Sequence, residues 1–404
     1  MNISGSAVTL GGVCVSPISS IILIKFGHKT CCQVALIGSF IFWLMIVTTP
    51  YVSLLLLARF LVGMCTTTLI SSTDLYIIET SHESVRGVVM IFLSTARYLG
   101  SVFIFAIGIS MLWWRVQALI CCFLTIVPLI LLIFFPTSPR YLASLGKKDE
   151  VRKSLSFYRG SKYDISTEFN KLEKIFEDDV GSEGSIPRQF SYMIKTRVRK
   201  IVGICLLIAF GTQIAGQGAV LAYAGPIMKE SMPNFNPYYL SLIIAIMRVL
   251  GSLIFLSISN KIPRRLTFLL SGLVSVISLS VFSTHLYLIE KEIDLFPWFI
   301  PILFISLLMI STAIFSPVGF LIIGEILPTN CRSLGYVLGD MACLTSYFLT
   351  VASFPILRDI ISPYGVFWSF ASILFVIILI PFTFIPETHG KNLEDIQMKL
   401  YNKE

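Results

Sequence analysis

TDLYIIETSHESVRGVV (residues 73–89) contains Glu79 and, seven positions later, Arg86. A second stretch, LIIGEILPTNCRSLG, repeats this spacing from Glu325 to Arg332. The two arginines are 246 residues apart, and each pair lies where a long apolar run ends. The recurrence of a charged pair at the same kind of boundary predicts a chain built from two similar halves.

Composition places most of the chain in lipid. Hydrophobic residues make up 55% of the 404 residues, charged residues make up 13%, and the mean hydropathy is +0.83. Ordinary soluble domains carry about a quarter charged residues, so a soluble fold could not cover this much apolar surface. A membrane-spanning helix needs about 20 mostly apolar residues. The sequence contains eleven such runs: 6–25, 31–49, 53–76, 87–110, 116–136, 200–224, 238–258, 266–286, 297–323, 334–356 and 364–385. It therefore predicts an all-α membrane protein with 11 transmembrane helices.

Lysine and arginine are distributed unevenly among the loops. Short loops rich in both residues alternate with loops that carry almost none, and the long segment 139–199 belongs to the positive set. The positive-inside rule places this set and the C-terminus in the cytoplasm of a multi-pass protein of the cell membrane. Eleven spans then leave the N-terminus outside, with no signal peptide before the first span. We therefore expect the first of twelve helices to be missing from the front.

An internal repeat emerges from the positions of the charged motifs. The corresponding segments are FGHK (26–29) with IPRR (262–265), and PTSPR (136–140) with PETHGK (386–391). Each copy lies at the predicted cytoplasmic end of its span, which is typical of parallel repeats. The predicted parts are an N-terminal half-bundle of five spans (1–138), a cytoplasmic loop (139–199), a C-terminal half-bundle of six spans (200–385) and a cytoplasmic tail (386–404).

Five motifs together resemble the sugar-porter branch of the major facilitator superfamily. The family patterns P-x-Y-x-x-E-x6-R-G, P-E-S-P-R and D-R-x-G-R-R resemble residues 74–87, 136–140 and 260–265. The tenth helix ends with Gly-Glu at 324–325, and the tail PETHGKNLEDI begins at Pro386. LGKKDEVRKSLSFYRG, which begins at Leu145, resembles the insect facilitated trehalose transporters. The resemblance implies the major facilitator fold and transport by alternating access, and it begins at the family's second helix.

The repeated charges are candidates for a gate. Carboxylates and guanidinium groups at helix ends can form bidentate, charge-assisted pairs. We expect such pairs to hold the cytoplasmic ends together while the cavity faces outward. The predicted network consists of Glu79, Arg86, Arg140, Arg264, Arg265, Glu325 and Arg332. The alternative is that these charges only terminate helices and set the topology.

The substrate site is expected in the second half, near the membrane midplane. A neutral sugar needs side-chain amides and hydroxyls together with an aromatic face. The seventh helix of sugar porters resembles Q-Q-x-S-G-x-N, which reads TQIAGQG here, so one glutamine is kept and glycine replaces asparagine. The resemblance implies the substrate-binding set Thr212, Gln213, Gln217, Gly218, Ser94 and Phe320. The alternative for the two glutamines is that they satisfy neighbouring backbone groups.

Two arginines interrupt the apolar pattern. Arg97 and Arg248 lie about 16 Å and about 24 Å from the predicted inner boundary, at 1.5 Å per helical residue. A charge at this depth is costly without a partner, and the available carboxylates are Asp340 and Asp74. Internal ion pairs, or snorkelling toward the outer surface, would explain both arginines. The other interpretation adds them to the substrate-facing residues, in a positively charged cavity.

These observations predict a carrier of trehalose, glucose or a related small polar solute by facilitated diffusion. We expect a monomer in the lipid bilayer, with no cofactor, no metal and no nucleic-acid partner. An enzyme is not expected, because the sequence offers no nucleophile, histidine and acid set and no P-loop. The alternatives are a non-transporting sugar sensor, a truncated inactive paralogue, or a carrier of an anionic solute that uses Arg97 and Arg248.

Overall fold

The computed structural model describes most of the chain. The exceptions are residues 1, 83–84, 111, 161–163, 167, 171, 173–185, 224–236, 260, 294–298, 328–330 and 385–404. Some side chains within the helices, among them those of Arg86 and Arg332, also lie outside the described part. All the regular elements that the structure describes are helices.

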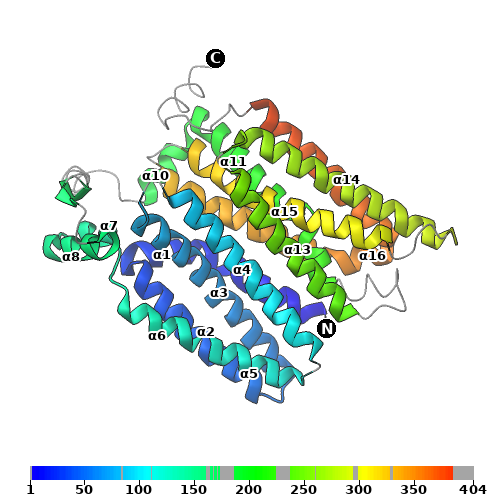
Figure 1. Ribbon diagram of the computed structural model, residues 1–404, viewed down its shortest axis with the longest axis horizontal. Helices are drawn as coiled ribbons and strands as arrows, with labels where there is room; N and C mark the ends of the chain where they lie inside the picture. Colours follow the sequence, from blue (N-terminus) through cyan, green and yellow to red (C-terminus); the bar gives the residue numbers. More distant parts are fainter. Residues whose placement is uncertain are drawn as a thin grey trace. The chain divides into compact units, whose positions relative to one another are not determined.

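The described residues form two compact units (Figure 1). We call residues 7–90 and 113–193 the N-terminal unit, and residues 1–6, 91–112 and 194–404 the C-terminal unit. The helices of the N-terminal unit are α1 (Asn2–Phe26), α2 (His28–Thr48), α3 (Val52–Thr80), α5 (Trp114–Leu124), α6 (Ile126–Phe134), α7 (Pro139–Ser144), α8 (Lys148–Arg159) and α10 (Ile186–Ile194). Those of the C-terminal unit are α4 (Arg86–Ile109), α11 (Thr196–Ile214), α13 (Pro237–Ile258), α14 (Arg264–Glu290), α15 (Phe299–Ile326) and α16 (Arg332–Phe384).

The long helices follow the apolar runs because backbone groups in lipid must find their hydrogen bonds inside the helix. Nine segments of the described residues are long and apolar enough to cross a membrane, so the predicted count of eleven is not confirmed. In α1 only Ala7–Ser19 qualifies, as a shorter apolar helix. The predicted spans 334–356 and 364–385 correspond to two helices within α16, which meet at a kink where the backbone of Ser362 is not helical.

Within the N-terminal unit, α2 packs along α3, α5 and α6. Its core includes a cluster of Ile46, Ala58, Val62 and Ala118. Gly63 of α3 lies directly against the backbone carbonyl of Val8 in α1, and Gly11 of α1 lies against the carbonyl of Phe60. A side chain at either glycine would collide with main chain, so these glycines permit α1 and α3 to approach closely.

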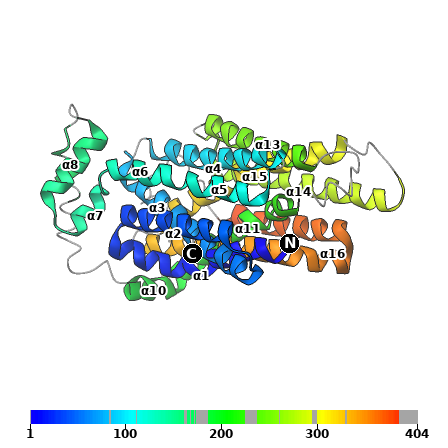
Figure 2. The same ribbon diagram turned by 90° about the horizontal axis from the view of Figure 1, so that it is seen from below.

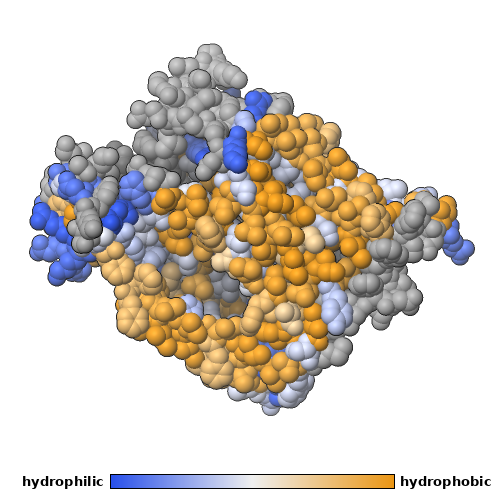
Figure 3. All heavy atoms as spheres, viewed as in Figure 1, coloured by the Kyte–Doolittle hydropathy of each residue, from blue (hydrophilic) through white to orange (hydrophobic). Residues whose placement is uncertain are grey.

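Two short helices follow α6 and form a polar region of the N-terminal unit. Figure 2 shows α7 and α8 beyond the end of α6. They share a small apolar cluster of Leu142, Val151, Leu155 and Phe169. In Figure 3 blue, hydrophilic spheres gather over α7 and α8, whereas orange spheres cover the long helices. This contrast is expected when the long helices face lipid and the short ones face water.

In the C-terminal unit, α11 packs on α16 and α15, and α14 packs on both of the same helices. The rings of Phe268 and Phe315 stack with their centroids 4.4 Å apart, joining α14 to α15. Ser275 and Ser311 share a 2.7 Å hydrogen bond between these two helices. Aromatic stacking and a satisfied polar pair therefore hold this part of the unit together.

The helix that begins with α11 is broken in its second half. It ends at Ile214, Gly216 adopts φ 77°, and residues 217–223 are helical again. Glycine suits this position because a positive φ is strained for a residue that carries a Cβ. Broken helices within a membrane domain are tolerated where they are buried in protein or line a cavity.

Candidate functional site

The break after α11 brings three predicted site residues together. Gln217 Nε2 donates to Gln213 Oε1 at 2.7 Å and to the carbonyl of Thr212 at 3.1 Å. That carbonyl lies in the last turn of α11, where backbone acceptors lack intrahelical partners. The structure thus gives Gln217 a backbone-satisfying role, which was the alternative interpretation of these glutamines.

One polar atom of this cluster has no partner. Gln217 is 2% exposed, and its Oε1 atom accepts no hydrogen bond from any described residue. A buried acceptor without a donor costs free energy unless a ligand or water supplies one. The neighbouring Gln213 is only half-buried, and its Nε2 atom reaches just a weak acceptor, Cys343 Sγ, at 3.3 Å. Both amides therefore retain hydrogen-bonding capacity for a polar ligand.

The deep arginine Arg248 lies on α13 of the C-terminal unit. Its guanidinium stacks over the ring of Tyr98 in α4, 4.3 Å from the ring centroid. No described carboxylate forms an ion pair with it, and its Nε atom is buried without a hydrogen-bond partner. Arg248 is therefore held by a cation–π contact with Tyr98 in this structure, and it forms no ion pair with Asp340.

The remaining candidates are more dispersed. Arg97 and Ser94 are half-buried on α4. Phe320 of α15 packs against Tyr336 of α16, with their ring centroids 5.7 Å apart. The place of these three side chains in a binding site stays a prediction. Gly218 follows Gln217 directly and is buried.

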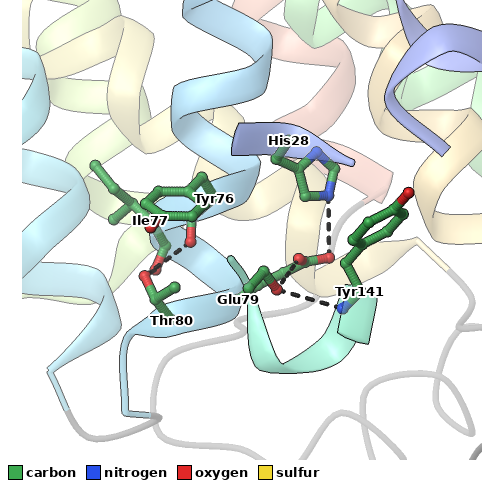
Figure 4. A network of polar contacts seen from close by, with 7 residues as sticks. His28, Tyr76, Ile77, Glu79, Thr80 and Tyr141 are labelled. Carbon is green, nitrogen blue, oxygen red and sulfur yellow. Dashed lines mark hydrogen bonds and ion pairs between the residues drawn. The ribbon is translucent and has the colours of Figure 1, made fainter. Parts of the chain in front are cut away.

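A second site lies at the ends of α2 and α3 (Figure 4). His28 Nε2 and Glu79 Oε1 are 3.1 Å apart, with side chains only 11% and 15% exposed. Ser138 Oγ donates to the other oxygen of the same carboxylate at 2.5 Å. Arg140 is exposed and contributes only longer-range electrostatics. Arg140 therefore forms no ion pair with Glu79 in this structure, and the Arg86 side chain lies outside the described residues.

The segment that carries Ser138 is fixed by several further contacts. Ser138 caps α7 by accepting from the Tyr141 backbone N–H at 3.4 Å, and the Tyr141 ring lies against Gly27 just before His28. The hydroxyls of Tyr76 and Tyr158 both donate to the Pro136 carbonyl, at 2.5 and 3.1 Å. Burial raises the pKa of the Tyr158 phenol, so this group stays a donor.

The corresponding site in the C-terminal unit joins α14 to α15. Arg264 Nη1 forms an ion pair with Glu325 Oε1, and the two side chains are 25% and 21% exposed. Of the two predicted partners for Glu325, Arg264 forms the pair. The Arg332 side chain and the tail motif at 386–391 lie outside the described residues.

The sequence prediction omitted His28 because it paired the carboxylates with arginines alone. The signal was present, since aligning FGHK with IPRR places His28 opposite Arg264. Arg59 was also missed. It is half-buried in α3, and its guanidinium lies 5.8 Å from the centroid of the Trp43 ring. Within the described residues, no group of His, Cys, Asp or Glu is arranged to hold a metal ion.

Comparison with protein families gives a match over almost the whole chain. The family model described as "Sugar (and other) transporter" matches residues 1–400. A facilitated trehalose transporter Tret1 from Apis mellifera ligustica is 27% identical over 361 residues, covering 88% of this chain and 71% of the bee protein. Its counterpart from Drosophila willistoni is 26% identical and covers 89% of this chain, but this chain spans only 41% of that protein.

Solved structures show the same architecture. The proton:xylose symporter XylE bound to 6-bromo-6-deoxy-D-glucose superposes with a TM-score of 0.80 at 17% identity, covering 99% of this chain and 89% of XylE. Inward-open XylE from E. coli gives a TM-score of 0.78 at 16% identity and covers 98% of this chain. The chain therefore has the fold of the major facilitator superfamily.

Proposed function

This chain belongs to the family of sugar (and other) transporters, and we propose that it carries a neutral sugar, trehalose or glucose, by facilitated diffusion. Its family and its apolar helices make it a multi-pass membrane protein. Relatives named facilitated trehalose transporters support the choice of substrate. The family is not one of enzymes, and neither the family nor these relatives support the sensor or anionic-solute alternatives.

The observation that carries the proposal is the unsatisfied amide cluster at the helix break. A sugar hydroxyl can donate to Gln217 Oε1, which has no donor among the described residues. The same hydroxyl, or its neighbour, can accept from Gln213 Nε2 in place of the weak contact with Cys343 Sγ. A hydroxyl is both donor and acceptor, so it suits two adjacent amides that offer one atom of each kind.

Transport would follow from alternating access of the two half-bundles around this site. The helix-end pairs at Glu79 and Glu325 would stabilise one state, because only an interaction that differs between states shifts their equilibrium. We further propose that the C-terminus is cytoplasmic, that the lipid-embedded protein acts as a monomer, and that Arg97, Ser94 and Phe320 line the pathway. The distribution of positive loops supports the orientation.

The test is uptake of labelled trehalose and glucose into oocytes or proteoliposomes that contain the full chain. Saturable uptake is expected, and it should fall about fivefold to tenfold in Gln217→Leu and Gln213→Leu, the effect of losing one hydrogen bond. Gln33→Leu on α2 is the matched control, and surface expression is measured in parallel. Absence of saturable uptake by the unmodified chain would overturn the function, and normal uptake by both variants would overturn the site.

A further inference from the structure

Gly218 lies against an aromatic ring of another helix. A Cβ atom at this position would be 2.7 Å from Cε2 and 2.9 Å from Cδ2 of Tyr347 in α16. Real Cβ atoms essentially never approach this closely, so no side chain larger than hydrogen fits beside the ring as it stands. The Tyr347 ring therefore occupies the volume that a side chain at position 218 would need.

The same face of α16 confronts the glutamine cluster at a second point. Cys343 lies four positions before Tyr347, and residues at this spacing share one face of a helix. Its sulfur lies 3.3 Å from Gln213 Nε2 and 3.7 Å from Thr212 Oγ1. Cys343 and Tyr347 thus form the wall opposite the broken helix, the first beside Gln213 and the second beside Gly218.

The Tyr347 hydroxyl is available to a ligand. The residue is half-buried, and no described group forms a hydrogen bond with the hydroxyl. The Arg248 guanidinium lies near enough to interact electrostatically with Tyr347. A residue that only filled space would need no hydroxyl. Tyr347 has a hydroxyl without a described hydrogen-bond partner, and its ring lies beside Gly218.

We propose that Tyr347 is a specificity-determining residue. Its aromatic ring and single hydroxyl occupy the place that a polar side chain at position 218 would otherwise take. The proposal rests on the proposed function. A side-chain amide at 218 would offer a donor and an acceptor to the sugar, whereas the phenol offers one hydroxyl and a ring for the C–H surface. Recognition should therefore depend on one sugar hydroxyl that forms a hydrogen bond with Tyr347. Changes to the neighbouring sugar hydroxyl should be tolerated.

The first experiment tests the steric relation by a double-mutant cycle, which isolates the coupling of two positions in contact. Gly218→Asn should lower glucose uptake about tenfold or more by overpacking, and adding Tyr347→Ala should recover at least about half of the loss on a logarithmic scale. Gly339→Ala on α16 is the matched control, because a Cβ there would meet only Ala209 Cβ at an ordinary 3.8 Å. Independent, additive effects of the two changes would overturn the proposal.

The second experiment tests the hydroxyl. Glucose and its 2-, 3-, 4- and 6-deoxy analogues compete for uptake by the unmodified chain and by Tyr347→Phe. Discrimination against one analogue should fall about fivefold in Tyr347→Phe, while the other three keep their ranking, because one hydrogen bond is lost. Unchanged discrimination against all four would overturn the proposal while leaving sugar transport intact. If the unmodified chain gives no uptake, the proposed function fails. The role of the Tyr347 hydroxyl is then tested by binding, by comparing how each sugar analogue raises the thermal stability of the purified unmodified protein and of Tyr347→Phe.

Discussion

In the N-terminal unit the ion pair at the helix ends joins His28 to Glu79, and in the C-terminal unit it joins Arg264 to Glu325. The positions correspond, since each base is the first residue of its helix and each acid is the second-last residue of the next. The chemistry differs. Arginine keeps its charge at every physiological pH, whereas imidazole changes charge between pH 5 and 8.

The supporting contacts differ as well. Glu79 also accepts from Ser138, so its carboxylate keeps one partner when His28 is neutral. The N-terminal pair is also less exposed than the C-terminal pair, at 11% and 15% against 25% and 21%. The ion pair therefore forms at the corresponding position in both units, but the base is a histidine in one unit and an arginine in the other.

The largest effect is expected when the permanent charge loses its partner. Glu325→Gln removes the Glu325 carboxylate from the Arg264 guanidinium, and arginine cannot respond by losing its proton. Discounted for partial exposure, the cost should be roughly 2 kcal/mol in the state that forms the pair, or about a 30-fold drop in sugar uptake. Uptake is measured at equal surface expression. A drop no larger than that of an exposed control, Glu290→Gln, would contradict a role for this pair.

The matching change in the N-terminal unit should be milder. Glu79→Gln leaves His28, which can lose its proton and remain a neutral hydrogen-bond partner for the new amide. We expect a cost of about 1 kcal/mol and about a fivefold lower uptake. The ratio of the two effects is the critical measurement, because equal losses would show that the histidine behaves like an arginine.

The smallest effect is expected from Ser138→Ala. This substitution removes one donor to Glu79 and the side-chain cap of α7 but leaves His28 in place. Loss of one hydrogen bond to a partly exposed carboxylate should lower uptake about twofold. A drop in uptake as large as that of Glu79→Gln would contradict the arrangement in which Glu79 shares its carboxylate between His28 and Ser138.

Hydropathy predicted the helices well because lipid leaves the backbone few alternatives. The predicted run 87–110 became α4, Arg86–Ile109, and 238–258 became α13, Pro237–Ile258. Hydropathy also separated 334–356 from 364–385, and the two helices of α16 meet at a kink between these spans. It could not predict that the single residue Ser362 makes this turn, since hydropathy reports which residues tolerate lipid and not where the backbone turns.

The sequence predicted which residues close together along the chain belong to the candidate site, but not which residues of other helices contact them. The motif at 212–218 placed Gln213 and Gln217 near each other in sequence, and the break at Gly216 brings their side chains into hydrogen-bonding contact. It could not predict Cys343 or Tyr347 as their neighbours, since these contacts bridge about 130 residues and arise from helix packing. His28 was hidden for a different reason: a histidine at the start of a helix has no sequence signal of pairing until the fold places a carboxylate beside it.

The close approach of α1 and α3 has a consequence for inherited variation. Every single-nucleotide missense change in a glycine codon introduces a residue with a Cβ atom. At Gly63 that atom would collide with the main-chain oxygen of Val8, which cannot swing away as a side chain can. Gly100, on α4, has no atom within 4 Å of the corresponding position. In a population, missense alleles should therefore be rare at codon 63 and common at codon 100, although both encode glycine within an apolar helix.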